Sequence, residues 1–535
     1  MVNGINPGPS PGTGFTPTPN FGLASPVWAR LKGKGPITVS PVGIATGADT
    51  VVPNAGADFG PDTPGTQNSG ADAALAALKA QGGGTVRFLP GNHLWTNYLS
   101  VNVSNVTLDF APGAKIVLPS AMWSLLNGSA QNFPPVIWVN NASNVKVKNP
   151  YIDGSNVPNT FAGGIFAVLV DTGSSHVKVS DGYVTNINLW PYAVLSGGIG
   201  TIPTGASPTN VSFLRCVANA SGSSNDGGGF KLDGNGSTGA QSTYISVRKG
   251  LVTNMTPGAF GLDVVRVAHA NVSDLVIVSA GSTTTGTEFV MVENFDWEDV
   301  VLEHLVVVDT VSSGSRGAAL LCYESGTGLH INNIDAVTGT GITITQGTTS
   351  GTDVTISGGR SIATNGNGLT IGPISGNGTG NVTNVSVSDL SLGGASGDYA
   401  LDFINNNAGS VLKSVRIRGG NVTLGSGGTV NFPGLSSSVE DVSIEGVMGY
   451  NPLGFAVSTP AVPASGTAQV NTNPFRARVY ITGAGTTTAY TITDPSGNAE
   501  TFSLALAAGQ EITLDPGASI TITYTTAPTW KWYGV

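Results

Sequence analysis

Alternation of apolar and polar residues dominates the chain between about residues 100 and 450. Stretches such as 105–108, 144–147 and 384–387 begin with asparagine and continue with an aliphatic residue at every second position. A period of two predicts β-strands with one buried face. Asparagine suits the tight turn before each strand, and its amide can bond to the same position in the next repeat. The pattern therefore predicts an all-β chain.

The strands recur about every thirty residues between 229 and 324. Three of them, at 230–233, 260–263 and 290–293, end in an acidic residue: Asp233, Asp263 and Glu293. A fixed period with alternation inside each unit predicts a solenoid whose turns stack in parallel, roughly 4.8 Å apart. Residues one period apart become neighbours in such a coil. We therefore expect the three carboxylates to form one column on its outer surface.

Composition narrows the class of protein. The 535 residues include 76 glycines and only 10% charged residues, a mixture that favours short strands and tight turns. A net charge of −10 without any basic cluster argues against nucleic acid as a partner. No apolar run approaches the length of a membrane span, and we expect no membrane insertion. Residues 1–8 lack the features of a secretory signal, which predicts release by lysis or inside a particle.

The two cysteines, Cys216 and Cys322, are too few for a disulfide framework in a chain of this length. Each lies in an apolar strand-like stretch, so we expect buried free thiols. The five histidines show no metal-ligand spacing. The sequence therefore predicts no metal and no cofactor.

Residues 56–92 carry the most specific signal in the chain. They combine a Gly-Ala-Asp start, an alanine-rich helical window at 71–80 and a Gly-Gly-Gly-Thr-Val strand followed by Pro90 and Gly91. This opening resembles that of the pectin-lyase-like right-handed parallel β-helix family, in which the helix caps one end of the coil. The resemblance implies a β-helix over 46–450, with 56–92 as its capping segment. Hydrolases, lyases, epimerases and non-enzymatic spikes share this fold, so it does not select an activity.

The two ends of the chain differ from the coil. Residues 1–45 are rich in proline and glycine and predict an extended N-terminal arm, and 451–474 predict a linker. Residues 475–535 predict antiparallel strands and a C-terminal β-sandwich. Aromatic residues near the C-terminus are expected to pack either on this sandwich or against a neighbouring subunit.

The last segment, residues 514–535, has a Leu-x-Pro-Gly-Ala-Ser-Ile-Thr-Ile-Thr-Tyr stretch followed by an Ala-Pro-Thr-Trp-x-Trp ending. It resembles the C-terminal modules of phage and prophage tail proteins. That resemblance implies a tailspike in the virion tail that acts outside the cell, on a polysaccharide of the host surface. It also implies a homotrimer whose N-terminal arm binds other tail or baseplate proteins.

The acidic column is the candidate catalytic site. In glycoside hydrolysis one carboxyl group protonates the leaving oxygen, and a second acts as nucleophile or activates water. Asp263 is expected to have a like charge on each side, so we expect it to have the most raised pKa and to be the general acid. Carboxyls on adjacent turns suit a retaining reaction, and carboxyls on alternate turns suit an inverting one. The sequence leaves both open.

Five further residues are predicted to bind substrate. Arg266 and Asp296 are also thirty residues apart and would lie beside the column, where Arg266 pairs with Asp296 or holds an acidic sugar. Trp297 is a candidate platform for stacking on a sugar ring. Tyr323 and Glu324 would continue the column.

Three alternatives to a tailspike hydrolase stay open. A lyase would hold Ca²⁺ on the acidic column and use Arg266 or Lys231 as base. The Asn-Asp-Gly at 225–227 resembles a polygalacturonase element, but that family's second aspartate and its Gly-His-Gly and Arg-Ile-Lys elements are missing. A non-catalytic receptor-binding or structural tail protein, or a free polysaccharide hydrolase or lyase, would fit the same scaffold.

Overall fold

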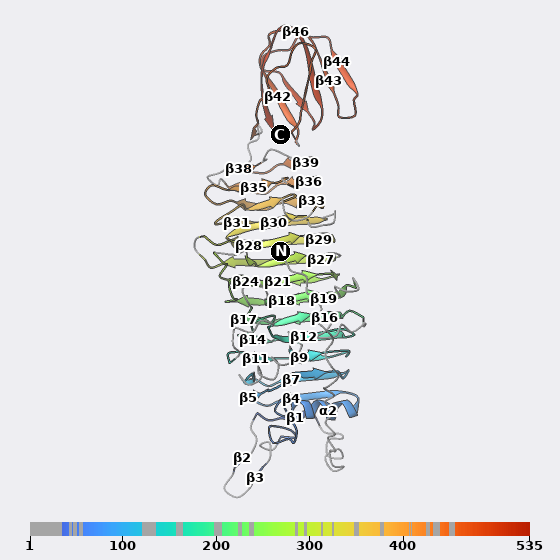
Figure 1. The fold of residues 1–535 in the computed structure, drawn as a ribbon, viewed down its shortest axis with the longest axis vertical. Coiled ribbons are helices and arrows are strands. Elements are labelled where there is room, and N and C mark those ends of the chain that lie inside the picture. The colour runs from blue at the N-terminus through green and yellow to red at the C-terminus, as the bar shows by residue number, and fades with distance from the viewer. Residues whose placement is uncertain are drawn as a thin grey trace. The chain divides into compact units, whose positions relative to one another are not determined.

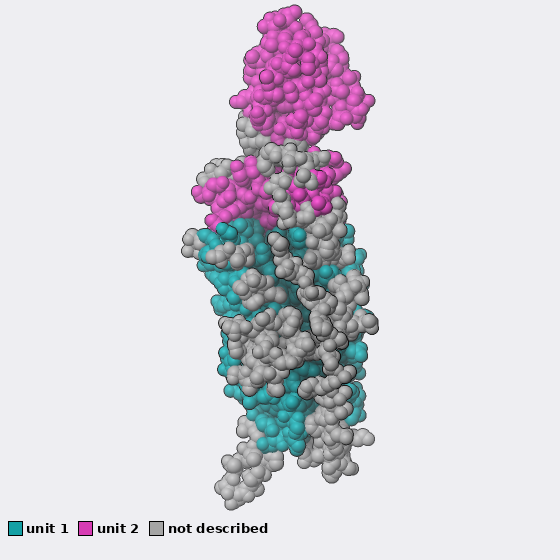
Figure 2. All heavy atoms as spheres, in the orientation of Figure 1, with its two compact units in different colours: residues 1–341 teal, residues 342–535 magenta. Residues whose placement is uncertain are grey.

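The computed structural model contains two compact units, residues 1–341 and 342–535, coloured separately in Figure 2. The structure describes residues 35–41, 45–46, 51–52, 57–119, 135–156, 164–196, 206–222, 227–234, 240–283, 287–293, 297–311, 314–323, 326–346, 353–374, 379–405, 407, 409–423, 428–431, 439–448, 455–473 and 475–534. Nearly all of the predicted N-terminal arm lies outside these residues. So do Asp296 and Glu324 of the predicted substrate site.

The first unit is a right-handed parallel β-helix, as the sequence predicts (Figure 1). Each turn contributes strands to three faces, and each strand pairs in parallel with its counterpart in the next turn. The first face contains β1 (Ile37–Val39), β4 (Gly84–Phe88), β7 (Val106–Phe110), β10 (Lys146–Lys148), β13 (Ser175–Ser180), β16 (Thr209–Leu214), β19 (Ser242–Arg248), β22 (Val267–Ala268) and β23 (Asn271–Ser273).

The second face contains β5 (Gly91–Leu94), β8 (Ala114–Val117), β11 (Tyr151–Asp153), β14 (Tyr183–Thr185), β17 (Val217–Asn219), β20 (Leu251–Thr253) and β24 (Val276–Ser279). Two long strands, β27 (Trp297–Asp309) and β29 (Gly326–Thr338), extend across the first and second faces. The third face contains β6 (Leu99–Val101), β9 (Pro135–Val139), β12 (Phe166–Val170), β15 (Tyr192–Val194), β18 (Gly228–Asp233), β21 (Phe260–Val265), β25 (Thr287–Glu288), β26 (Val290–Glu293) and β28 (Gly317–Tyr323). A small antiparallel pair, β2 (Ala45–Thr46) and β3 (Val51–Val52), precedes the helix.

The interior of the coil is built from columns of aligned apolar side chains. On the third face one such column is buried throughout and consists of Leu99, Ile137, Val168, Tyr192, Phe230, Leu262 and Val290. The rings of Tyr192 and Phe230 stack with centroids 5.2 Å apart. Burial of these columns supplies the main stabilisation of the solenoid, because each turn covers the apolar face of the one before.

One backbone conformation recurs at or next to the start of the first-face strands. Asn105 and Asn144 have φ of 59° and 56°, and the Asn144 amide donates to the Asn105 side-chain oxygen over 3.1 Å. Later turns keep the left-handed conformation with His176, Asn210, Tyr244, His269 and Asp299. The turn therefore requires a positive φ, which asparagine adopts at low cost, and does not require an amide.

The predicted capping helix is α2 (Ala71–Gln81). It buries Leu75 and Leu78 together with four alanines and packs against β1, β4 and β6. Asp72 near its start accepts hydrogen bonds from the Thr66 hydroxyl and the Gln67 backbone. Gly82 ends the helix with φ of 78°, where a side chain would be strained.

Other sequence expectations for the first unit concern cysteine and membranes. Cys216 and Cys322 are buried free thiols, and burial raises the pKa of each to about 12. Within the described ranges, no helix combines the length and hydropathy needed to cross a membrane.

The second unit continues with parallel strands and ends in antiparallel ones. The parallel strands are β30 (Thr340–Thr345), β31 (Val354–Ala363), β32 (Leu369–Ile371), β33 (Val382–Ser388), β34 (Ser391–Gly393), β35 (Tyr399–Phe403), β36 (Leu412–Arg418), β37 (Asn421–Thr423), β38 (Gly428–Asn431) and β39 (Val439–Glu445). The C-terminal sandwich has one sheet of β40 (Phe455–Ala456), β47 (Thr529–Gly534), β42 (Ala477–Gly483) and β45 (Glu511–Leu514). Its other sheet has β41 (Ala468–Val470), β46 (Ser519–Thr526), β43 (Thr486–Thr493) and β44 (Ala499–Phe502).

The aromatic residues near the C-terminus belong to the sandwich itself. Trp530 is 7% and Trp532 1% exposed, and both join the sandwich core. The Trp530 indole donates to the Pro460 carbonyl over 2.7 Å. Of the two expectations for these residues, packing on their own domain is therefore the one observed.

Candidate functional site

The candidate acidic residues lie on the third face, on strands β18, β21 and β26. The structure corrects their predicted register. Asp233 is paired with Val265, and Val265 with Glu293, while Asp263 is paired with Lys231. The three carboxylates therefore do not form a single column, and that prediction is wrong.

The physical reason is unequal loop length between the turns. The step from Asp233 to Val265 is thirty-two residues, and the step from Val265 to Glu293 is twenty-eight. The thirty-residue repeat is only their average. Because side chains on a strand alternate with a period of two, the shift of two residues leaves Asp263 on the outer surface. The shift places Asp263 in the neighbouring column on the same face, which contains Lys231.

Four charged side chains form an ion cluster there, which we call the 231–266 cluster: Lys231, Asp233, Asp263 and Arg266. The Lys231 ammonium lies 2.5 Å from Asp263 Oδ2 and 3.9 Å from Asp233 Oδ2. Arg266 Nη1 lies 3.6 Å from Asp233 Oδ1. The Lys231 ammonium is therefore shared by the two carboxylates, and Arg266 lies beside Asp233.

The two carboxylates differ in exposure and in their contacts with the cations. The Asp263 side chain is 3% exposed and lies in direct contact with the Lys231 ammonium. The Asp233 side chain is 18% exposed, and neither of its contacts with the two cations is shorter than 3.6 Å. Burial raises the pKa of Asp233 to about 6, with the Asp263 charge adding to the shift while Lys231 and Arg266 oppose it. Asp233 is therefore a carboxyl for which a proton near neutral pH is indicated.

The other predicted site residues have different outcomes. Glu293 lies in the column of Asp233, two strands further on, and is half-buried. Tyr323 ends β28 and is also half-buried. Trp297 is 1% exposed and its ring packs against Gly326, so it cannot stack on a sugar and that prediction is wrong.

An apolar cluster beside the ion cluster was not predicted. It includes residues of β12 and β15 and consists of Trp138, Phe166, Leu169, Leu189, Trp190, Ala193, Leu195 and Phe260. The Lys231 ammonium lies 5.3 Å from the centre of the Trp190 ring, so the two clusters are contiguous. Trp138 and Phe260 are the partly exposed aromatic members. The signal in the sequence is the unbroken apolar run at 166–170, which indicates a strand buried on both sides.

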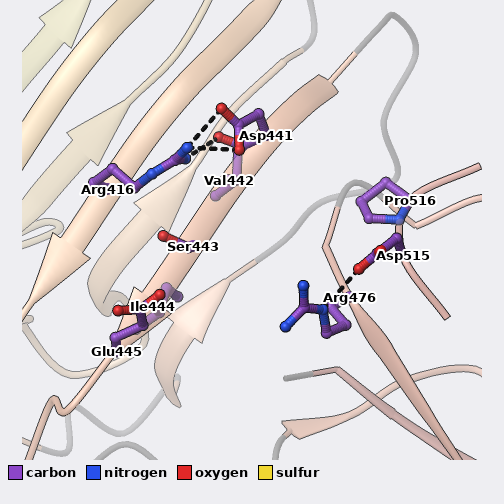
Figure 3. A pocket seen from close by; sticks show the side chains of 9 residues that line it. All are labelled: Arg416, Asp441, Val442, Ser443, Ile444, Glu445, Arg476, Asp515 and Pro516. Carbon is purple, nitrogen blue, oxygen red and sulfur yellow. Dashed lines mark hydrogen bonds and ion pairs between the residues drawn. The ribbon is translucent and has the colours of Figure 1, made fainter. Parts of the chain in front are cut away.

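Two other groups of polar residues are weaker candidates. A cleft of about 540 Å³ in the second unit is lined by Arg416, Asp441, Arg476 and Asp515 among others (Figure 3). Its arginines are already paired, with Arg416 2.6 Å from Asp441 and Arg476 2.7 Å from Asp515.

The other group is His269, Glu298 and Asp299 on the first face, whose potential metal-ligand atoms lie within 4.8 Å of one another. All three side chains are exposed, and no other feature of the described residues there indicates a bound ion.

No protein-family model and no curated protein matches this chain. Solved structures do match. A mutant form of the periplasmic alginate epimerase AlgG is 12% identical, with 72% of this chain and 91% of that chain covered and a TM-score of 0.46. An exopolygalacturonase from Thermotoga maritima is 11% identical, with coverages of 71% and 87% and a TM-score of 0.42. ORF18 of Geobacillus virus E2 is 12% identical, with coverages of 86% and 74% and a TM-score of 0.38.

Sequence identities this low indicate at most a similar fold. The strand pairing of this chain establishes its fold independently. That fold is a right-handed parallel β-helix. The chemistry must be argued from the side chains of this chain.

Proposed function

We propose that this protein binds a polysaccharide on the third face of its β-helix and hydrolyses it there. The observation that carries the proposal is the environment of Asp233, whose burial raises its pKa to about 6. A carboxyl group that keeps its proton near neutral pH can donate it to the oxygen of a leaving sugar. A purely structural surface gains nothing from a buried carboxyl of this kind, because burial of the charged form costs free energy.

The second carboxyl of the proposed reaction is Glu293. Asp233 and Glu293 share one column and are separated only by Val265, which puts two strand spacings, roughly 9.6 Å, between their backbones. Inverting glycosidases hold their two carboxyls roughly 6.5–9.5 Å apart, with room for a water molecule. In this assignment Asp233 protonates the leaving group and Glu293 activates the water.

Asp263 takes a different role from the one its sequence position suggests. With a side chain 3% exposed and an ion pair to Lys231, it is too buried to reach a polymer. We assign it to positioning Lys231, which in turn lies beside Asp233. Lys231 and Arg266 remain 19% and 21% exposed and can bind oxygen atoms of the substrate.

The neighbouring apolar cluster would bind the sugar rings on either side of the reacting bond. Trp138 and Phe260 are partly exposed, and aromatic faces pack against the apolar faces of sugars. Tyr323 lies near the opposite end of the same surface, at the end of β28, and is proposed as a further contact.

The biological setting we propose is a tailspike that acts at the host surface. The proposal rests on the resemblance of the last segment to modules of tail proteins, and a parallel β-helix and a C-terminal sandwich are compatible with it. We propose on the same ground that the protein is a homotrimer and that residues 1–45 bind other tail proteins.

A second candidate function is receptor binding without cleavage. The 231–266 cluster favours it in one respect: two acidic and two basic side chains neutralise each other, as a structural network would. In that case the surface would bind a glycan and leave it intact.

The experiment that separates these functions compares wild type and Asp233→Asn on purified capsular or cell-wall glycans from candidate hosts. Chain shortening, new reducing ends and ultraviolet absorbance from unsaturated products are scored separately from binding. New reducing ends without unsaturated products, lost in the variant, support hydrolysis. Unsaturated products would indicate a lyase. Binding by both proteins without shortening would leave only the receptor-binding function.

A further inference from the structure

A second surface of the first unit also combines aromatic and hydrogen-bonding groups. It lies on the second face, over β8, β11, β14 and β17, and not on the third face that carries the ion cluster. We call it the tyrosine face and define it by Lys115, Tyr151, Asp153, Tyr183 and Asn219. None of these residues has a part in the proposed reaction.

The two tyrosines are aligned by the strand register. Tyr151 and Tyr183 are cross-strand partners on β11 and β14, and their ring centroids lie 5.1 Å apart at 82°. Tyr183 is 38% exposed and is one of only a few large apolar side chains so exposed among the described residues. The pair therefore presents aromatic surface to solvent over two successive turns.

The rings are held in place by their neighbours. The Lys115 ammonium lies 5.0 Å from the centre of the Tyr151 ring and 2.5 Å from Asp153 Oδ2. The Asn219 amide donates to the Tyr183 hydroxyl over 3.3 Å. A binding surface whose side chains are already ordered loses little entropy when a ligand binds.

Polar groups run beside the rings on the same face. Asp153, Thr185 and Asn219 occupy one column, next to the column of the two tyrosines. The Asn219 amide also donates to the Thr185 hydroxyl over 3.1 Å, and Asn219 is the partly exposed member of the column, since Asp153 and Thr185 are buried. Aromatic surface beside an ordered, partly exposed amide suits a sugar, whose faces are apolar and whose edge is hydroxylated.

Charge on this face indicates the kind of sugar. Lys115 and Asp153 form an ion pair, which raises the pKa of Lys115. Burial acts to raise the pKa of Asp153, but Lys115 and hydrogen bonds from Ser155 and Asn186 outweigh it and lower that pKa. The cation is thereby already neutralised and not available for an anionic ligand. The tyrosine face therefore suits neutral hexose units.

We propose that the tyrosine face is a non-catalytic binding site for neutral hexose units of a polysaccharide. It would hold a stretch of polymer on the second face while the proposed reaction takes place on the third. Because it uses no residue of the 231–266 cluster, its binding is independent of cleavage.

The test measures binding of the full-length protein to an immobilised panel of neutral α- and β-linked glucose, mannose and galactose oligosaccharides. We expect Tyr183→Ala to weaken binding about tenfold or more, the effect of removing an aromatic contact worth about 1.4 kcal/mol. Tyr183→Phe retains the ring and should bind nearly as wild type does. Tyr244→Ala is the matched control, since Tyr244 is 57% exposed and stacks on His269 at another part of the coil.

Asp233→Asn is included so that the two proposals can fail separately. It should bind the panel as wild type does even if cleavage is lost. Three results would overturn the proposal: no binding of any oligosaccharide by the wild type, equal binding by wild type and Tyr183→Ala, or equal losses in Tyr183→Ala and Tyr244→Ala. Sedimentation of each variant covers the remaining case, in which Tyr183→Ala changes self-association and the tyrosine face is instead a contact between copies of the chain.

Discussion

Lys231 and Asp263 are cross-strand partners on β18 and β21, and their side chains form an ion pair 2.5 Å long on the outer surface of the coil. This pairing decides the chemistry available on the third face. It ties the Asp263 carboxylate to a cation, while Asp233 has a raised pKa and a longer contact with the same cation. The proton donor of the proposed reaction is thus selected by strand register.

Asp233→Asn should abolish cleavage while preserving binding. The amide has nearly the shape of the carboxyl but cannot donate an acidic proton, and loss of general acid catalysis typically costs 10²–10⁴-fold in rate. The measurement is the rate of reducing-end release from a cleavable host glycan. Asp181→Asn is the matched control, because Asp181 is an exposed aspartate paired with Arg215 on another turn and should leave the rate unchanged. Full activity in Asp233→Asn would remove Asp233 from the mechanism.

The pH dependence of cleavage should report the same group. A general acid must carry its proton, so kcat/KM should fall as pH rises through about 6, where Asp233 loses its proton. The slope above that pH should approach tenfold per unit. Initial rates between pH 4.5 and 8 measure this limb. A rate that stays constant across that range would assign the proton donor to another residue.

The fold was predictable from the sequence because its signals are local and repeated. Period-two alternation, positive-φ turns such as that at Asn144 and the alanine-rich helix each follow from nearby residues. The site was predictable only in part. Its residues were found from their acidity and spacing, but the partner of each depends on the length of the intervening loop, which a mean period does not give. The sequence likewise could not show that Trp297 is covered by its neighbours.

The Asp233 carboxyl should also make stability depend on pH. Its folded pKa of about 6 lies above the ordinary value of 3.8, so the folded state holds the proton more tightly than the unfolded state does. The stabilisation from this proton is complete below about pH 4 and is lost as pH rises through about 6. Thermal unfolding midpoints of wild type minus those of Asp233→Asn should therefore decline over this window. Asp402, whose pKa is also raised by burial, is present in both proteins. The difference between their unfolding midpoints therefore reports Asp233 and not Asp402. A constant difference would show that the pKa of Asp233 is the same in both states.

Asp263→Ala should destabilise the protein even though it is not a catalytic substitution. It removes the carboxylate 2.5 Å from the largely buried Lys231 ammonium and leaves Asp233 at 3.9 Å. Loss of a partner for a buried polar group costs about 1–3 kcal/mol, and the partial exposure of Lys231 places the effect toward the lower end. The unfolding midpoint measures it. The double variant Lys231→Met with Asp263→Ala should recover part of the loss, because no unpaired charge is left buried. A double variant less stable than Asp263→Ala would contradict this account.

Gly326→Ala should test the packing that removes Trp297 from the surface. Gly326 begins β29 opposite Trp297, and a Cβ added there would lie 2.0 Å from Cδ2 of the indole. The ring is rigid and 1% exposed, so it cannot move aside, and overpacking of this kind costs about 1–3 kcal/mol. We expect a lower unfolding midpoint for Gly326→Ala than for Gly35→Ala, since a Cβ at Gly35 meets no atom within 4 Å. Adding Trp297→Phe to Gly326→Ala should cost less than the two single changes together, because the smaller ring makes room for the methyl group. Strict additivity of the two changes would mean that they do not share a contact.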